Sequence, residues 1–283
     1  GFGKKTFDSG SYYEGEFQHD SYCGHGEYHS YVGWHTEGEY KYNKLNGKGK
    51  YYFSSGTVYE GDFQSDCFHG HGVMRYNNGD VYDGEWREDK HSGLGTYKFA
   101  NGDVYVGGWS LGDYYGHGRY TSIEGWVYEG GYSGGKRFGR GTLRLSNGDV
   151  YEGTLKDGKW HGQGKFVWVG GDTYEGSFVE GIRQGKGKYQ YCGGDSYEGN
   201  WINNSPNGYG TFKMSGASFT GVFVEGILEG EGTATLANGD KYKGYFVHGT
   251  FSDTEATYTF KKGGSYVGGF ENGVFHGEGT LTY

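Results

Sequence analysis

The chain has 283 residues, including 62 glycines, one proline and three cysteines, and its formal net charge is −9. An acidic chain without a lysine and arginine cluster lacks the basic footprint of nucleic-acid-binding proteins and the polybasic segments that attract anionic lipid. No apolar run approaches the roughly 18 residues of a membrane-spanning helix. Nucleic acid is therefore excluded as an expected partner and membrane lipid is disfavoured, while three cysteines at unrelated positions favour a reduced, intracellular setting.

A Tyr-x-Gly unit recurs along the chain at intervals of 23 residues, shortening to 22 before Phe219 and lengthening to 24 before Tyr266. A fixed period of this length indicates a repeat array, so we predict about 12 repeats of 23 residues. The repeats begin at Tyr13, Thr36, Tyr59, Tyr82, Tyr105, Tyr128, Tyr151, Tyr174, Tyr197, Phe219, Tyr242 and Tyr266.

Each repeat is predicted to open with a half-buried strand. With the first residue counted as position zero, position two is always Gly and position four is large and apolar, as in residues 82–86, Tyr-Asp-Gly-Glu-Trp. Alternate residues of a strand face the same way, so one face carries the aromatic rings and the glycine. Position one is Glu or Asp in eight of the twelve repeats, which predicts that the opposite face is exposed to solvent.

A tight loop and a second strand are predicted to follow. Position seven is always Gly, Asn or Asp, the residue types that best tolerate a left-handed backbone. A Gly-x-Gly motif at positions eleven and thirteen leads into the second strand, such as residues 72–76, whose basic residues are expected to pair with the position-one acids. The Asn-Gly-Asp sequences that come next, as at residues 78–80, predict a type I′ turn.

Stacked hairpins of this kind predict an all-β fold, an elongated single-layer antiparallel meander that forms one array over residues 1–283. Residues 1–3 and residue 283 fall inside repeats, so the array is expected to be truncated mid-repeat at both ends. The repeat that starts at Tyr242 has Asp253 and Glu255 where Gly-x-Gly belongs. We therefore expect an irregular repeat near residues 242–265, with a change of register or a bend.

The aromatic stripe has two interpretations. Its rings pack on one another and hold neighbouring hairpins together, as buried aromatic side chains normally do. Alternatively, because a single sheet has no second layer to cover this face, part of the stripe stays accessible as an apolar groove for a partner. We predict such a groove for the stripe as a whole, formed mainly by the regular central repeats: Tyr59, Phe63, Tyr82, Trp86, Tyr105, Trp109, Tyr128 and Tyr132.

Metal binding and catalysis are weaker candidates. Cys67, His69 and His71 alternate along one strand and are the densest set of potential Zn²⁺ ligands, but histidine recurs at the same positions in other repeats, so no metal is assigned. The Gly-x-Gly motifs lack the helix and the lysine of a phosphate-binding loop. No Ser/His/Asp or paired-carboxylate arrangement stands out, so we expect neither a cofactor nor enzymatic activity.

Tyr-x-Gly-x-Trp/Phe, a turn residue, Gly-x-Gly and Asn-Gly-Asp at a spacing of 23 residues together resemble the MORN (membrane occupation and recognition nexus) repeat family. Residues 82–86, followed by Gly-Leu-Gly at 93–95 and Asn-Gly-Asp at 101–103, are close to its consensus. The resemblance implies a meander of hairpins with an aromatic groove that binds an extended or helical partner segment. It also implies scaffold roles in ciliary radial-spoke heads and cytoskeletal collars.

We therefore expect a non-catalytic scaffold that binds a protein partner along the glycine–aromatic groove. By family analogy, its setting is a ciliary or cortical cytoskeletal assembly, such as the axoneme of a cilium or flagellum. Exposed strands at the ends of the array would also permit a homodimer. The alternative is a regulatory or membrane-tethering MORN module of a larger enzyme, such as a phosphoinositide kinase.

Overall fold

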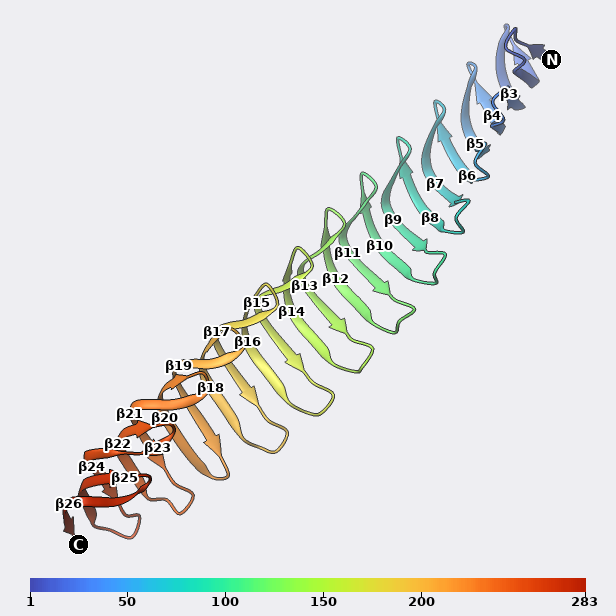
Figure 1. The fold of residues 1–283 in the computed structure, drawn as a ribbon. Coiled ribbons are helices and arrows are strands. Elements are labelled where there is room, and N and C mark those ends of the chain that lie inside the picture. Colours follow the sequence, from blue (N-terminus) through green and yellow to red (C-terminus); the bar gives the residue numbers. More distant parts are fainter. The chain divides into compact units, whose positions relative to one another are not determined.

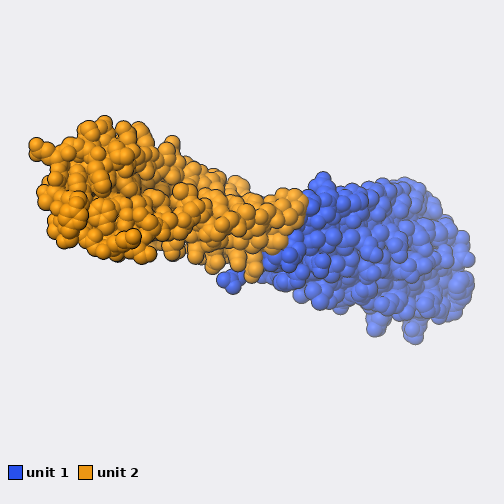
Figure 2. Space-filling model, turned by 90° about the horizontal axis from the view of Figure 1, so that it is seen from below, with its two compact units in different colours: residues 1–146 blue, residues 147–283 orange.

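The computed structural model describes residues 1–283 and contains only β-strands, turns and loops. The chain divides into two compact units, unit 1 (residues 1–146) and unit 2 (residues 147–283), which are coloured separately in Figure 2. Within each unit the hairpins follow one another in chain order and neighbouring strands pair antiparallel (Figure 1). The predicted all-β meander of stacked hairpins is confirmed. No helix long and apolar enough to cross a membrane is present.

The strands of unit 1 alternate between seven and nine residues after the short first strand: β1 (Phe2–Thr6), β2 (Tyr12–Gln18), β3 (Ser21–His29), β4 (His35–Lys41), β5 (Lys44–Tyr52), β6 (Val58–Gln64), β7 (Cys67–Arg75), β8 (Val81–Arg87), β9 (Lys90–Lys98), β10 (Val104–Ser110), β11 (Asp113–Thr121), β12 (Val127–Ser133) and β13 (Lys136–Arg144).

The strands of unit 2 are similar except around the short β23: β14 (Val150–Lys156), β15 (Lys159–Val167), β16 (Thr173–Val179), β17 (Ile182–Gln190), β18 (Ser196–Ile202), β19 (Ser205–Met214), β20 (Ala217–Val224), β21 (Ile227–Thr235), β22 (Lys241–Val247), β23 (Thr250–Phe251), β24 (Asp253–Thr259), β25 (Ser265–Glu271) and β26 (Val274–Thr282).

The tight turn within each repeat has a left-handed backbone, as predicted for position seven. Between β8 and β9, Glu88 has φ 49° and Asp89 has φ 61°. Positive φ at both central residues is the requirement of a type I′ two-residue turn. Position seven has positive φ in every repeat, from Asp20 to Gly273.

The prediction of a type I′ turn at Asn-Gly-Asp is wrong. Gly79 has φ 94°, but Asn78 is not left-handed. The amide of Gly79 donates to the carbonyl of Tyr76 at 3.0 Å, and the amide of Tyr76 donates to the carbonyl of Asp80 at 2.9 Å. These bonds close a three-residue loop in which a turn is followed by a left-handed glycine. Asn is favoured there because its side-chain oxygen accepts the Asp80 amide at 3.0 Å, a bond that holds the loop closed.

Each hairpin bends sharply across its second strand. Tyr82 pairs with Tyr97 in the β-ladder, yet its ring stacks at 3.7 Å on His91, which lies six residues away along β9. Six residues of straight strand would span about 20 Å, so β9 must fold back. The bend lies at Gly93, the first glycine of Gly-x-Gly, where φ is 55°.

The other two glycines of the repeat make room for the tyrosine ring. A Cβ added to Gly84 would lie 2.5 Å from the Cα of Gly95, and one added to Gly95 would lie 2.5 Å from the Tyr82 hydroxyl. The ring therefore lies directly over the paired glycines, as the aromatic-over-glycine pattern predicts. The Tyr82 hydroxyl donates to the Glu85 carbonyl at 2.8 Å, which satisfies its one buried polar group.

The repeat that starts at Tyr242 departs from this geometry. Its second strand is interrupted at Ser252, so that β22 pairs first with β23 and then with β24. The Asp253 carboxylate accepts the Tyr245 amide at 2.8 Å, and Ala256 is fully buried opposite Gly268, where regular repeats have glycine. Asp253 and Ala256, which stand where regular repeats have glycine, flank a shift in the β24–β25 register.

Candidate functional site

The eight residues predicted to line an aromatic groove lie inside the hairpins. Tyr59, Phe63, Tyr82, Trp86, Tyr105, Trp109, Tyr128 and Tyr132 are each between 0 and 7 % exposed. Because each hairpin folds back at its left-handed glycine, its second arm covers the face that an unfolded single sheet would leave open. The expectation that this face stays accessible is thus corrected, and the rings present no free surface to a partner in this structure.

Two contacts organise these rings, one within a repeat and one between repeats. Within a repeat, position nine stacks on position zero, as Tyr114 does on Tyr105 at 3.8 Å. Between repeats, position four meets the preceding position zero edge-on, as Trp109 does with Tyr82 at 5.1 Å. The Trp109 indole also donates to the carbonyl of Gly95 in the preceding repeat, at 3.3 Å. The stripe is therefore the core that joins successive hairpins.

Position nine is the structural residue that the sequence analysis missed. It is occupied by side chains as different as Tyr22, Leu45, His91, Trp160 and Arg183. What they share is a flat or apolar surface, not a residue type, so no motif reveals the position. The sequence feature that could have revealed the bend is the first glycine of Gly-x-Gly, which has a positive φ in the structure.

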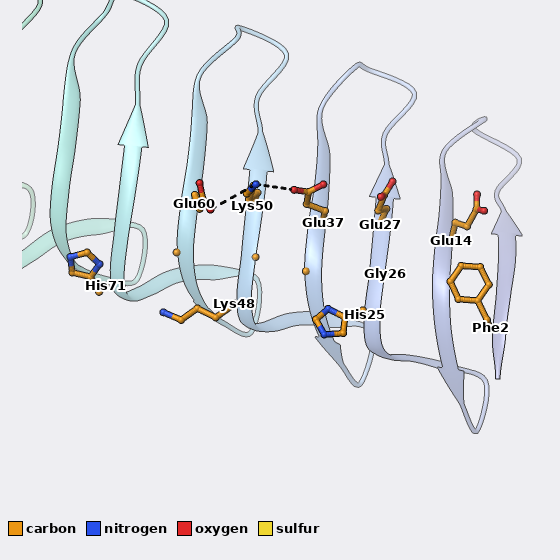
Figure 3. A pocket seen from close by; sticks show the side chains of 13 residues that line it. Phe2, Glu14, His25, Gly26, Glu27, Glu37, Lys48, Lys50, Glu60 and His71 are labelled. Carbon is orange, nitrogen blue, oxygen red and sulfur yellow. Dashed lines mark ion pairs between the residues drawn. The ribbon is translucent and has the colours of Figure 1, made fainter.

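The solvent-facing side of unit 1 carries a furrow, shown in Figure 3. Its floor is bare backbone at Gly26, Gly38, Gly49 and Gly61, which have no side chains to fill it. The hollow measures about 900 Å³. Its rims are formed by Phe2 and by charged or titratable side chains: Glu14, His25, Glu27, Glu37, Lys48, Lys50, Glu60 and His71.

The charges along this furrow are paired but remain in water. Lys50 lies between Glu37, at 3.4 Å, and Glu60, at 3.8 Å (Figure 3). Tyr52, Glu60 and Glu37 together raise the pKa of Lys50 above its usual value. Ion pairs this exposed contribute little to stability. Their effect is to set the charge that the furrow presents, which is acidic in this unit.

A matching furrow of about 960 Å³ lies in unit 2, with a different charge. Its rims combine acids and bases, so it lacks the acidic excess of the first furrow. The lining side chains include Gln163, Glu175, Lys186, Lys188, Glu198, Asn200, Tyr209, Thr211 and Lys213. The two furrows therefore favour segments of different charge.

The potential metal ligands of β7 do not converge. No group of three or more His, Cys, Asp or Glu side chains is placed to hold a metal ion. His71 instead approaches Asp83 at 3.1 Å, while Cys67 and His69 pair with other positions of β6. Cys67 is a free cysteine, as are Cys23 and Cys192.

A chain of hairpins that repeat every 23 residues, each bent over a tyrosine–glycine core, defines a β-hairpin repeat protein. The model of the MORN repeat matches ten stretches: residues 13–34, 37–58, 59–81, 82–104, 128–150, 151–173, 174–196, 197–215, 219–241 and 266–283. These stretches cover more than half of the chain, which therefore belongs to the MORN repeat family. The matches leave out the repeats that start at Tyr105 and Tyr242.

Several solved structures are distantly similar in fold. One is the SAS-4 (dCPAP) TCP domain of Drosophila melanogaster in complex with a proline-rich motif of Ana2 (dSTIL), at 13 % identity and a TM-score of 0.34, covering 53 % of this chain and 81 % of that one. Another is the wild-type TCP10 domain of Danio rerio CPAP, at 10 % identity and a TM-score of 0.24, covering 86 % of this chain and 96 % of that one. Likeness this low carries no argument about function. No curated protein matches significantly.

Proposed function

We propose that the chain is a non-catalytic scaffold that binds a segment of a protein partner along the furrow on the outer face of its hairpins. The observation that supports this most is the furrow itself, a strip of bare glycine backbone between two rows of charged side chains. A segment laid there would meet polar groups on both sides without displacing any side chain from the floor. The buried aromatic core would then serve to hold this surface in shape.

The proposal includes an intracellular cytoskeletal setting, with a cilium or flagellum axoneme as the favoured compartment. That part is supported by the family resemblance alone. Neither a nucleic acid nor a cofactor belongs to the proposal. Membrane lipid is disfavoured because the net charge is −9.

Site-specific photo-crosslinking in cells tests the location of the binding surface. A benzoyl-phenylalanine replaces His25 or Lys186 in the furrows, and, as controls, Glu88 or Glu124 in exposed turns. We expect the two furrow positions to yield discrete adducts of one size class and the turn positions to yield none. Adducts from the turns alone, or from no position, would contradict the proposal.

A further inference from the structure

Two consecutive repeats in unit 1 differ from the others along the furrow. At position three they have glycine, Gly108 and Gly131, and at position ten they have a large aromatic residue, Tyr115 and Phe138. Tyr115 is 56 % exposed and Phe138 is 51 % exposed. Both rings are thus open to solvent, unlike the rings of the buried aromatic stripe.

The glycine at position three leaves the bend glycine of the same repeat uncovered. In the first repeat, the Glu16 carboxylate covers Gly24 and accepts the His25 amide at 2.9 Å. Where position three is glycine this cover is missing, and a Cβ added to Gly116 or Gly139 would meet nothing within 4 Å. The space beside the two rings is therefore open.

The backbone requires glycine at position three in these two repeats. A Cβ on Gly108 would collide with the backbone carbonyl of Tyr115, and one on Gly131 would collide with that of Phe138. A side chain at position three would push the ring-bearing segment away. The position-three glycine and the exposed ring at position ten thus lie next to each other in both repeats.

Two aliphatic side chains extend this apolar surface. Leu94 on β9 is 69 % exposed and pairs with Gly108 across the β9–β10 ladder. Val106 lies two residues before Gly108 on β10 and is 50 % exposed. Together with Tyr115 and Phe138 they form what we call the central dock, which spans the neighbouring strands β9 to β13.

The charge around the central dock is positive. Position three is acidic in the first four repeats, as at Glu16 and Glu85, but carries no charge at Gly108 and Gly131. Arg140, at position twelve, is exposed and has no ion-pair partner. Arg119 reaches Glu129 only at 4.0 Å, and both side chains are more than half exposed. An apolar surface beside exposed guanidinium groups is complementary to an apolar segment that carries carboxylates.

The spacing of the two rings favours a helical ligand. Tyr115 and Phe138 lie at equivalent positions of β11 and β13, two strand spacings or about 9.6 Å apart. Residues seven apart in an α-helix are about 10.5 Å apart and face nearly the same way. In an extended segment, residues on one face repeat at about 6.6 or 13.2 Å, which fits the two rings less well.

We propose that the central dock binds an acidic amphipathic helix of a partner protein, with its apolar side chains over Tyr115 and Phe138 and its carboxylates toward Arg119 and Arg140. This proposal rests on the proposed scaffold function and names the chemistry of the segment that one part of the furrow takes. The furrow lined by residues 2–71 is acidic and would repel such a helix. Selectivity for the dock therefore comes from the two repeats that combine glycine at position three with an exposed aromatic ring at position ten.

Fluorescence anisotropy with two designed peptides tests this assignment. Both are fluorescein-labelled helices of about 18 residues with leucine at heptad positions, one with glutamate and one with lysine at the remaining charged positions. We expect the whole chain to bind the glutamate peptide at least about tenfold more tightly than the lysine peptide. Equal binding of the two, or preference for lysine, would overturn the proposal.

Variants then locate the binding. Tyr115→Ser combined with Phe138→Ser should weaken binding of the glutamate peptide about tenfold or more, and Arg140→Glu should reduce the preference for it. These side chains are exposed, so circular dichroism and the thermal midpoint should stay near those of the unmodified chain. Tyr42→Ser, which removes a ring that is 78 % exposed in the turn between β4 and β5, is the matched control and should leave binding unchanged.

The outcomes separate this inference from the scaffold proposal. Weakening by Tyr42→Ser as large as by the double serine variant would remove the assignment to the central dock. Furrow crosslinks at His25 and Lys186 without any binding of the glutamate peptide would refute the dock and leave the scaffold standing. Absence of the furrow crosslinks together with absence of peptide binding would refute the dock and the scaffold proposal.

Discussion

At the residue scale, one tyrosine and two glycines form the smallest unit on which the fold depends. The ring of Tyr82 fills the space above Gly84 and Gly95, and its hydroxyl is satisfied by a backbone carbonyl. Burial raises the pKa of the equivalent Tyr128 to about 12, so these phenols stay neutral at physiological pH. In a regular repeat neither glycine can be replaced by alanine without a clash, because a methyl group on either glycine meets the ring or the opposite backbone.

Gly95→Ala should therefore destabilise the chain strongly. The added methyl group would lie 2.5 Å from the Tyr82 hydroxyl, and relief of such overpacking typically costs about 1–3 kcal/mol. The matched control is Gly170→Ala. At this position the methyl group meets nothing within 4 Å, and φ lies outside the left-handed region that favours glycine. Urea unfolding followed by circular dichroism measures both. Equal free energies of unfolding for the two variants would contradict the account of the glycine slot.

His91 should make stability depend on pH. Its ring stacks on Tyr82 and lies 3.0 Å from the Tyr76 hydroxyl, and burial lowers its pKa from 6.5 to about 4. The folded chain thus keeps His91 neutral while the unfolded chain protonates it, so its contribution to stability is lost as the pH falls from about 6.5 to about 4.

The test replaces His91 with leucine, the residue type that Leu45 supplies at the same position. Between about pH 7 and about pH 5, the thermal midpoint of His91→Leu should fall less than that of the unmodified chain. The ten other histidines are present in both proteins, so their effects cancel in the comparison. A steeper fall in the variant would show that His91 is not the residue responsible.

At the element scale, turns of successive hairpins are joined by side chains as well as by the β-ladder. Asp80 accepts the Tyr97 hydroxyl and the Ala100 amide of the next repeat, both at 2.7 Å. On the opposite edge, the Asp89 side chain accepts the Phe68 amide of the preceding repeat, also at 2.7 Å. Each hairpin is therefore bound to its neighbour at both ends and through the aromatic core.

Asp80→Ala should lower the thermal midpoint by about 4 °C or more, because it leaves a tyrosine hydroxyl and a backbone amide without their acceptor. Glu129→Ala, which removes only an exposed contact of 4.0 Å to Arg119, is the matched control and should change the midpoint little. Differential scanning calorimetry measures both. A larger effect from the control would show that the turn ladder contributes little.

The sequence was sufficient for the hairpins and their order, and insufficient for the bend. The 23-residue period, the glycine positions and the left-handed position seven could be predicted because few residue types fit those backbone conformations. Asp89 is an example. The covering of the aromatic face could not be predicted in this way. It depends on the contact between positions zero and nine, such as that of Tyr82 with His91, and the residue type at position nine varies between repeats. The central dock was missed for a related reason: Gly108 and Gly131 look like ordinary repeat glycines until the covering carboxylate of other repeats is seen.

At the scale of the whole molecule, the contacts between repeats predict a modular response to deletion. Removing residues 59–81, one full period, would join Val58 to Tyr82 with every slot still in place. We expect this variant to keep its far-ultraviolet circular dichroism spectrum and its cooperative unfolding. The slope of its free energy of unfolding against urea concentration should be smaller by roughly one part in twelve. Removing residues 59–69, which is not a full period, should abolish the folded spectrum. Similar behaviour of both deletions would argue against a strict 23-residue register.

The side-chain contacts that join successive hairpins at both of their turns, such as those of Asp80 and Asp89, have a mechanical consequence within either unit. Since every hairpin is fastened to its immediate neighbours, tension applied along the chain would detach one hairpin while the next stays anchored. Each detachment would release 23 residues, or about 65 Å of slack after the lost thickness of about 10 Å is subtracted. Under load, such a protein would behave as a tether that lengthens in equal steps.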